Sequence, residues 1–230
     1  MGAVLRRWRN ALDVGSCFAA HRRLLAINHQ LDSRLTSRSP TRHQSQRPHQ
    51  VDSPMSVPEL ELRQLRADDE RSFLEALAEF RSEQPPWDFA LGYTQGETFE
   101  QYVRKQEDWS RGERLPPGFV PGGFYVGIVE GEVVGRVSIR FRLNEFLSKL
   151  GGHIGYGVRA SLRRRGYATR MLQLALPLCR IHGIESALVI CDVDNVGSRR
   201  VIERCGGVFE SITNDPSLQI QRRRYWVATS

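Results

Sequence analysis

The sequence predicts an α/β fold, in which helices flank a mixed β-sheet. Two observations lead to this fold class. A β-hairpin pattern lies near the middle of the chain, and strand and helix patterns alternate from there to the C-terminus. The chain has 230 residues, of which 40% are hydrophobic, and this size suits one domain with an appendage better than two domains.

The domain is expected to begin with a strand and two helices. Leucines alternate with polar residues over 59–66, which predicts a strand. The pair Asp68 and Asp69 can cap a helix over 68–81, where phenylalanines and leucines recur at helical spacing. A second helix is predicted over 98–109, and a loop rich in proline and glycine follows it.

A two-residue turn, Glu130-Gly131, joins two apolar segments and predicts the hairpin. Its strands are expected over 124–129 and 132–141, and the segment 144–152 is expected to be a loop. The remaining predicted elements are a strand over 153–158, a helix over 167–182, a strand over 187–191, a helix over 196–205, and strands over 207–212 and 220–227.

The positive charge of the chain is concentrated near its N-terminus. The formal net charge is +7, but residues 1–54 hold nine Arg, no Lys and three Asp, which leaves 24 basic and 23 acidic side chains in residues 55–230. The nearly neutral domain is therefore not expected to bind nucleic acid, and such a role stays open only for the arginine-rich leader.

The leader, residues 1–54, is expected to be disordered because its second half offers almost nothing to bury. Two interpretations of it stay open. Either Met55 is the true start and the leader is an inert or wrongly assigned tail, or the leader is an organelle transit peptide. We favour the first interpretation and therefore expect a cytoplasmic protein.

Other protein classes are excluded by composition. No segment approaches the roughly 20 uninterrupted apolar residues of a membrane-spanning helix, so no membrane partner is expected. The cysteines are too few and too scattered for a disulfide scaffold or a zinc site, which predicts reduced thiols and no metal. They are Cys17, Cys179, Cys191 and Cys205.

An arginine- and glycine-rich segment joins the predicted strand 153–158 to the helix after it. Three arginines, 163–165, are followed by Gly166 and Ala168. The first amides of a helix are unpaired and carry partial positive charge, and glycine and alanine let a bound group approach the backbone. The pattern predicts a pyrophosphate cradle, the alternative being a solvated turn that caps an ordinary helix.

Two motifs resemble those of the GNAT superfamily of acyl-CoA-dependent N-acetyltransferases. Arg163-x-x-Gly166-x-Ala168 is similar to its acyl-CoA signature, and Asn195-x-x-Ser198 is similar to its second conserved element. The two motifs lie in the expected order with a predicted strand between them. Their combination is closest to a poorly characterised branch of bacterial predicted acetyltransferases.

The resemblance spans roughly residues 57–227 and implies a single N-acetyltransferase domain over 55–230. The implied fold is a GNAT-like central mixed sheet of six or seven strands with flanking helices. Two of the strands are expected to splay apart where acyl-CoA binds. The resemblance also allows a homodimer.

Acetyl-CoA is the implied cosubstrate. The main-chain amides of residues 164–169 would hold its pyrophosphate, and the backbone of Val158 would pair with the pantetheine arm and donate to the thioester oxygen. For Asn195 and Ser198 the alternative is helix capping. The residues expected to bind acetyl-CoA are Val158, Arg163, Arg164, Arg165, Gly166, Tyr167, Ala168, Thr169, Asn195 and Ser198.

Amine attack on a thioester needs a neutral amine and an acid for the departing thiolate. Many members of the superfamily supply the acid from a tyrosine four residues after the small residue of the second motif, where this chain has Ile202. Tyr156 and Tyr225 are the substitute candidates. Glu145 is a candidate base and His153 another, and direct attack by an amine that loses its proton to water stays open.

The implied reaction is acetyl transfer from acetyl-CoA to a primary amine of a small molecule, an amino acid or a protein N-terminus, by direct attack in a ternary complex. The missing tyrosine leaves an alternative, a non-catalytic domain that senses acyl-CoA. We interpret Arg222, Arg223 and Arg224 as a charged edge strand rather than as contacts for an anionic substrate group.

Overall fold

The structure, a computed structural model, describes residues 59–84, 87–215 and 220–230. The interpretations of the leader, of Met55 and of Cys17 fall outside these residues. The strands are β1 (Glu61–Gln64), β2 (Gly122–Val129), β3 (Glu132–Arg140), β4 (Ile154–Val158), β5 (Ser186–Asp192), β6 (Val208–Asp215) and β7 (Ile220–Ala228). The longer helices are α2 (Glu70–Ser82), α3 (Phe99–Arg111), α4 (Tyr167–Ile181) and α5 (Val196–Arg204).

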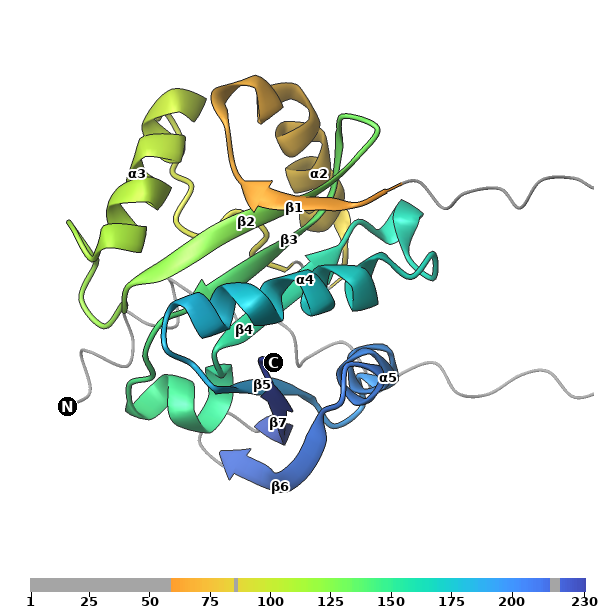
Figure 1. Ribbon diagram of the computed structural model, residues 1–230. Helices are drawn as coiled ribbons and strands as arrows, with labels where there is room; N and C mark the ends of the chain where they lie inside the picture. Colours follow the sequence, from red (N-terminus) through yellow and green to blue (C-terminus); the bar gives the residue numbers. More distant parts are fainter. Residues whose placement is uncertain (1–58, 85–86, 216–219) are drawn as a thin grey trace, which may run out of the picture.

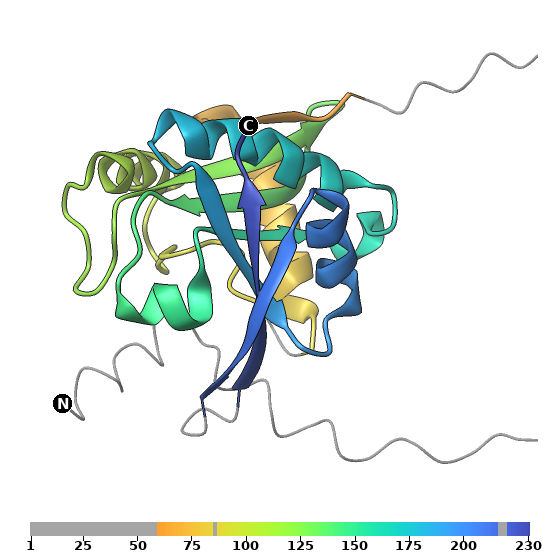
Figure 2. The same ribbon diagram turned by 60° about the horizontal axis from the view of Figure 1, so that its bottom comes forward.

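The seven strands form one mixed sheet in the order β1-β2-β3-β4-β5-β7-β6. Neighbouring strands run antiparallel, except that β4 and β5 are parallel. The predicted fold class is therefore confirmed. Figures 1 and 2 show α4 lying across one face of this sheet and α2 on the opposite face.

Local sequence explains where several elements begin and end. Glu130 and Gly131 both have positive φ (51° and 80°), as the tight turn of a hairpin requires. The Thr98 side chain accepts from Gln101 N and so caps α3, and Gly112 ends that helix in the left-handed conformation (φ 81°). Thr98, Gly112 and Gly131 are residue types that favour these conformations, whereas the positive φ is strained for Glu130.

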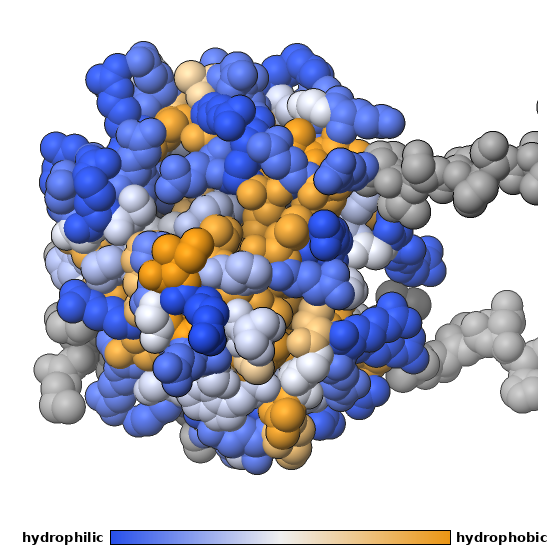
Figure 3. All heavy atoms as spheres, viewed as in Figure 1, coloured by the Kyte–Doolittle hydropathy of each residue, from blue (hydrophilic) through white to orange (hydrophobic). Residues whose placement is uncertain are grey.

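The sheet separates two hydrophobic cores. Met171 and Leu172 of α4 and Ile202 of α5 are fully buried against one face, and Phe73 and Phe80 of α2 are buried against the other. On the α4 side, Figure 3 shows hydrophobic residues gathered near the helix and hydrophilic residues around them. Both faces of the central strands are therefore covered, which explains why β2 and β3 are buried along nearly their whole length.

The prediction of a loop over 144–152 is wrong in part, because this segment contains a π-helical turn, η2 (Leu147–Gly151). Two arginines of β7 hold this turn: Arg224 Nη1 donates to Ser148 O, and Arg222 Nη1 donates to Leu150 O (3.1 Å). The interpretation of these arginines as a charged edge strand is wrong, because β7 lies between β5 and β6. A π-helical turn has no 3.6-residue periodicity, and its supports lie more than seventy residues away in the sequence. Local patterns could not predict it.

Within the described residues, no helix is long and apolar enough to cross a membrane. Cys179, Cys191 and Cys205 are free thiols. Burial raises the pKa of Cys179 to about 12 and that of Cys191 to about 11, so both are protonated at neutral pH. These two cysteines therefore serve as small apolar residues of the core.

Candidate active site

Strands β4 and β5 are joined only at the start of β4, which meets the middle of β5. Ile154 and Val189 are their one facing pair in the described sheet. His153 completes the junction, since its amide donates to Leu188 O (2.7 Å) and its Nδ1 accepts from Leu188 N (2.9 Å). Beyond the junction the two parallel strands separate, so the splay expected from the sequence is present.

The backbone of Val158, at the end of β4, faces this gap. Arg159 N donates to Val134 O on β3 (3.0 Å), and the polar groups of successive strand residues point to opposite edges. The amide and carbonyl of Val158 therefore point to the β5 side. Arg163 Nε donates to the carbonyl (3.0 Å), and the amide is directed into the gap.

The turn before α4 exposes a run of backbone amides. Arg164 and Gly166 have positive φ (64° and 86°), which is strained for arginine and ordinary for glycine. The first helical hydrogen bond at this end of α4 runs from Arg170 N to Gly166 O (3.0 Å). The amides of residues 167–169 therefore have no partner within the helix. No atom lies within 4 Å of the position that a Cβ on Gly166 would take. The turn is open, as a cradle for an anion requires.

Glu79 of α2 and Glu83, which directly follows that helix, hold the loop that leads to this turn. Glu79 accepts from Ser161 N (2.7 Å), from Arg159 Nε (2.9 Å) and from Ser161 Oγ (3.1 Å). Four residues later, Glu83 accepts from Arg163 Nη2 (2.6 and 2.7 Å). Burial acts to raise the pKa of Glu79, but the hydrogen bonds from Ser161 and Arg159 outweigh it and leave that pKa below its ordinary value. The carboxylate is ionised at neutral pH and anchors the loop.

Tyr156 crosses from β4 to α5. Its hydroxyl lies 2.8 Å from Ser198 Oγ and 3.3 Å from Ser198 O. Asn195 Oδ1 accepts from Ser198 N (2.9 Å), so Asn195 caps α5. Burial raises the pKa of Tyr156 well above its usual value, although the bond to Ser198 acts in the opposite direction. The structure thus brings Tyr156, Ser198 and Asn195 together beside the gap, with the phenol protonated.

The other two residues named as catalytic candidates lie elsewhere. Tyr225 is 1% exposed in the core beneath α5, and its hydroxyl meets Glu203 (3.3 Å). Glu145 is 85% exposed and pairs with Lys149 (2.9 Å), which lowers the pKa of the carboxyl group. Ile202, at the position where the superfamily often has its tyrosine, is fully buried. Of the three catalytic candidates, Tyr156, Tyr225 and Glu145, only Tyr156 forms a hydrogen bond with another predicted site residue.

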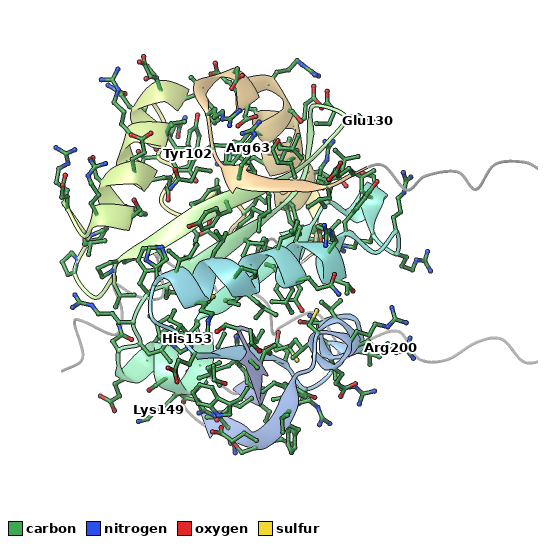
Figure 4. The ribbon with its side chains drawn as sticks, in the orientation of Figure 1. Arg63, Tyr102, Glu130, Lys149, His153 and Arg200 are labelled. Atoms are coloured by element: carbon green, nitrogen blue, oxygen red, sulfur yellow. The ribbon has the colours of Figure 1, made fainter. Side chains whose placement is uncertain are left out.

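His153 is held as a neutral ring. Burial, with a smaller effect from the charge of Arg140, lowers the pKa of His153 to about 4. Because Nδ1 accepts a hydrogen bond from Leu188 N, the neutral ring carries its proton on Nε2 and has no free acceptor. In Figure 4, His153 lies between α4 and η2. This geometry makes His153 a hydrogen-bond donor and not a base.

Sequence reasoning missed Glu79 and Glu83. Glu79 lies in the last turn of α2 and Glu83 directly after the helix, but their partners lie about eighty residues away. From the sequence we interpret the run of arginines as part of an anion cradle, and no local pattern indicates that Arg163 has a carboxylate partner. Among the described residues, no group of three or more His, Cys, Asp or Glu side chains is arranged to hold a metal ion.

Known proteins with this fold include acetyltransferases. Mycobacterium smegmatis RimJ in complex with CoA-disulfide has a TM-score of 0.56 and 18% identity, covering 75% of this chain and 83% of that one. RimL, a ribosomal-protein α-N-acetyltransferase in complex with coenzyme A, has a TM-score of 0.52 and 21% identity, covering 76% and 96%. An N-acetyltransferase from Staphylococcus aureus Mu50 has a TM-score of 0.50 and 15% identity, covering 75% and 99%.

These identities show a shared fold. No curated protein matches the chain. The family model described as the acetyltransferase (GNAT) domain matches residues 59–208, which is more than half of the chain. With the splayed strands, the open turn before α4 and this match, the chain belongs to the GNAT superfamily and is an N-acetyltransferase.

Proposed function

We propose that the protein transfers an acetyl group from acetyl-CoA to a primary amine by direct attack in a ternary complex. The observation that carries this proposal is the separation of β4 from β5 after a single facing pair, directly beside the open helix terminus of α4. A thioester placed in such a gap is open to an amine from the opposite side of the sheet. The acceptor is a small molecule, an amino acid or a protein N-terminus, the last supported by the name of RimL.

The cradle for the pyrophosphate consists of the main-chain amides of residues 164–169. These donors stand at the positive end of the α4 dipole, and the exposed side chains of Arg164 and Arg165 add full positive charges. Tyr167 is buried, so it contributes its amide and not its phenol. Arg163 acts indirectly in this proposal, because its guanidinium bonds to Glu83 and to Val158 O.

The amide of Val158 polarises the acetyl group. Because it points into the gap, this amide can donate to the thioester oxygen as negative charge builds up there. Bound acetyl-CoA supplies an activated acyl group with a thiolate as the leaving group. Asn195 and Ser198 line the same gap from α5 in this proposal, in addition to their role in capping that helix.

Tyr156 is the proposed acid. As the C–N bond forms and the C–S bond breaks, the phenol donates its proton to the departing sulfur, and Ser198 is within reach to relay a replacement (2.8 Å). No residue near the gap is proposed as the base. Glu145 is exposed and its pKa is lowered by Lys149, and the neutral ring of His153 has no free acceptor nitrogen. The attacking amine therefore loses its proton to water.

The test is thiol release from acetyl-CoA across a panel of primary amines, together with calorimetric titration of CoA. We expect CoA binding, and thiol release that depends on at least one amine. CoA binding without turnover on any amine would favour the acyl-CoA sensor instead. Absence of CoA binding would overturn both assignments.

A further inference from the structure

Arg140 ends β3 and lies against the backbone of β4. A Cβ on Gly155 would lie 3.0 Å from Arg140 Nη1 and 3.5 Å from its Nη2. The guanidinium reaches the strand because glycine has no side chain there. Gly155 directly follows Ile154, the residue of β4 that pairs with β5. The guanidinium therefore lies beside the point where β4 and β5 separate.

Arg140 belongs to the face of the sheet that α2 and α3 cover. Side chains alternate along a strand; Ile139 lies in the core beneath α4, and Arg136, on the same face as Arg140, donates to two backbone carbonyls of the segment between α2 and α3. The cradle lies at the end of α4, and Val158, which leads to it, is about 10 Å along β4 from Gly155. The group that Arg140 binds is thus separate from the pyrophosphate.

The guanidinium of Arg140 has a buried donor with no acceptor. Its Nη1 is buried and forms no hydrogen bond in the described structure. By contrast, Arg136 donates to Ser138 Oγ (2.8 Å). Arg222 Nε also lacks a hydrogen bond, but it lies 3.3 Å from the carboxylate of Asp192, so its charge is paired. Burial, and then the charge of Arg222, lower the pKa of Arg140 to about 10, so Arg140 stays cationic at neutral pH. Arg140 as a whole is half-buried, but a buried donor without an acceptor is costly, and a ligand anion would explain it.

We propose that Arg140 binds a carboxylate of the amine acceptor, which makes free amino acids the preferred class of acceptor. The inference rests on the proposed acetyl transfer and names the substrate of that same site. A guanidinium presents paired donors that match the two oxygens of a carboxylate, and the nearby Arg222 adds a second positive charge. The acceptor enters from the α2 and α3 side, opposite to α4.

Binding without turnover provides the first test. Saturation-transfer NMR of the full chain with CoA is recorded with a mixture of free amino acids and with the matched mixture of their carboxamides. We expect signals from one or more free amino acids, and an affinity at least about tenfold weaker for the corresponding carboxamide. Equal binding of acid and amide, or no binding of any amino acid, overturns the inference.

Arg140→Gln and Arg142→Gln form the matched pair of variants, because Arg142 is an exposed arginine two residues further along the chain. Arg140→Gln is expected to lose the preference for the free acid and to raise the KM of the acceptor at least about tenfold, with the KM of acetyl-CoA unchanged. Arg142→Gln is expected to behave as wild type. If acids bind at Arg140 but thiol release fails, the proposed transfer is wrong while the anion site stands.

A stability measurement separates this role from a structural one. Without ligand, Arg140→Met is expected to raise Tm by about 2–6 °C, since it removes a half-buried charge and a buried donor that has no acceptor. A fall in Tm would mean that the folded protein already stabilises the guanidinium, and this would overturn the inference. Retention of the preference for free acids in Arg140→Gln would overturn it as well.

Discussion

Glu79 couples helix α2 to the loop that presents the cradle, and Glu79→Gln tests this coupling. The carboxylate accepts three hydrogen bonds from Arg159 and Ser161 and is 21% exposed. A glutamine keeps the size of the side chain, but it has one acceptor oxygen and places an NH₂ group against a donor. If the bond to Ser161 N survives, the bond to the guanidinium of Arg159 is lost.

The expected magnitude follows from that one charge-assisted bond. Its loss destabilises the fold by about 2 kcal/mol, which lowers Tm by roughly 4–8 °C for a domain of this size. The cradle loop must then be ordered when CoA binds. Fixing one residue costs about 1–2 kcal/mol, so the Kd of CoA is expected to rise about fivefold to thirtyfold.

The assays are thermal unfolding and calorimetric titration of CoA, with Glu75→Gln as the control. Glu75 lies one turn earlier on α2 and forms an exposed ion pair with Arg71, so its loss should change Tm by less than about 2 °C. Because the pKa of Glu79 is lowered from 4.5 in the folded state, its stabilisation is present above pH 4.5 and is lost as the pH falls below that value. The difference in Tm between wild type and Glu79→Gln should therefore decrease as the pH falls below 4.5. Equal Tm and equal Kd for the two variants at pH 7 would refute the coupling.

Three further variants test the catalytic assignments. Tyr156→Phe is expected to lower kcat by about 100-fold with little change in CoA affinity, because it removes the acid but keeps the ring; steady-state kinetics with calorimetry would show it, and an unchanged kcat would contradict the role. Tyr225→Phe removes only the core contact with Glu203 and should change kcat less than about threefold, so a larger loss would restore Tyr225 as a candidate. Glu145→Gln removes an exposed ion pair and should change kcat less than about twofold across the pH profile; loss of an acidic limb from that profile would show that Glu145 is the base.

Elements whose signals are local were predictable from the sequence. The turn of the hairpin depends on Glu130 and Gly131 alone, and both have the required positive φ. The start of α4 at Tyr167 follows from Gly166, which holds the left-handed conformation that glycine adopts most readily. Both elements were therefore predicted to within one or two residues.

Contacts between segments far apart in the sequence were not predictable. The turn η2 depends on Arg222 and Arg224 of β7. Arg136 and Arg140, four residues apart on β3, have different surroundings: Arg136 donates to the segment between α2 and α3, and Arg140 lies against Gly155 of β4. Periodicity indicates which residues share a strand face, but it does not indicate what packs on that face.

The affinity of CoA for two matched glycine variants tests the cradle most directly. Gly166 and Gly183 lie at the two ends of α4, both have positive φ (86° and 76°), and neither has an atom within 4 Å of the Cβ position. Gly166→Glu and Gly183→Glu therefore impose similar backbone strain and the same added charge. We predict that Gly166→Glu raises the Kd of CoA at least about 100-fold and that Gly183→Glu changes it less than about threefold. Equal affinities for the two variants would contradict the assignment of the α4 terminus as the phosphate site.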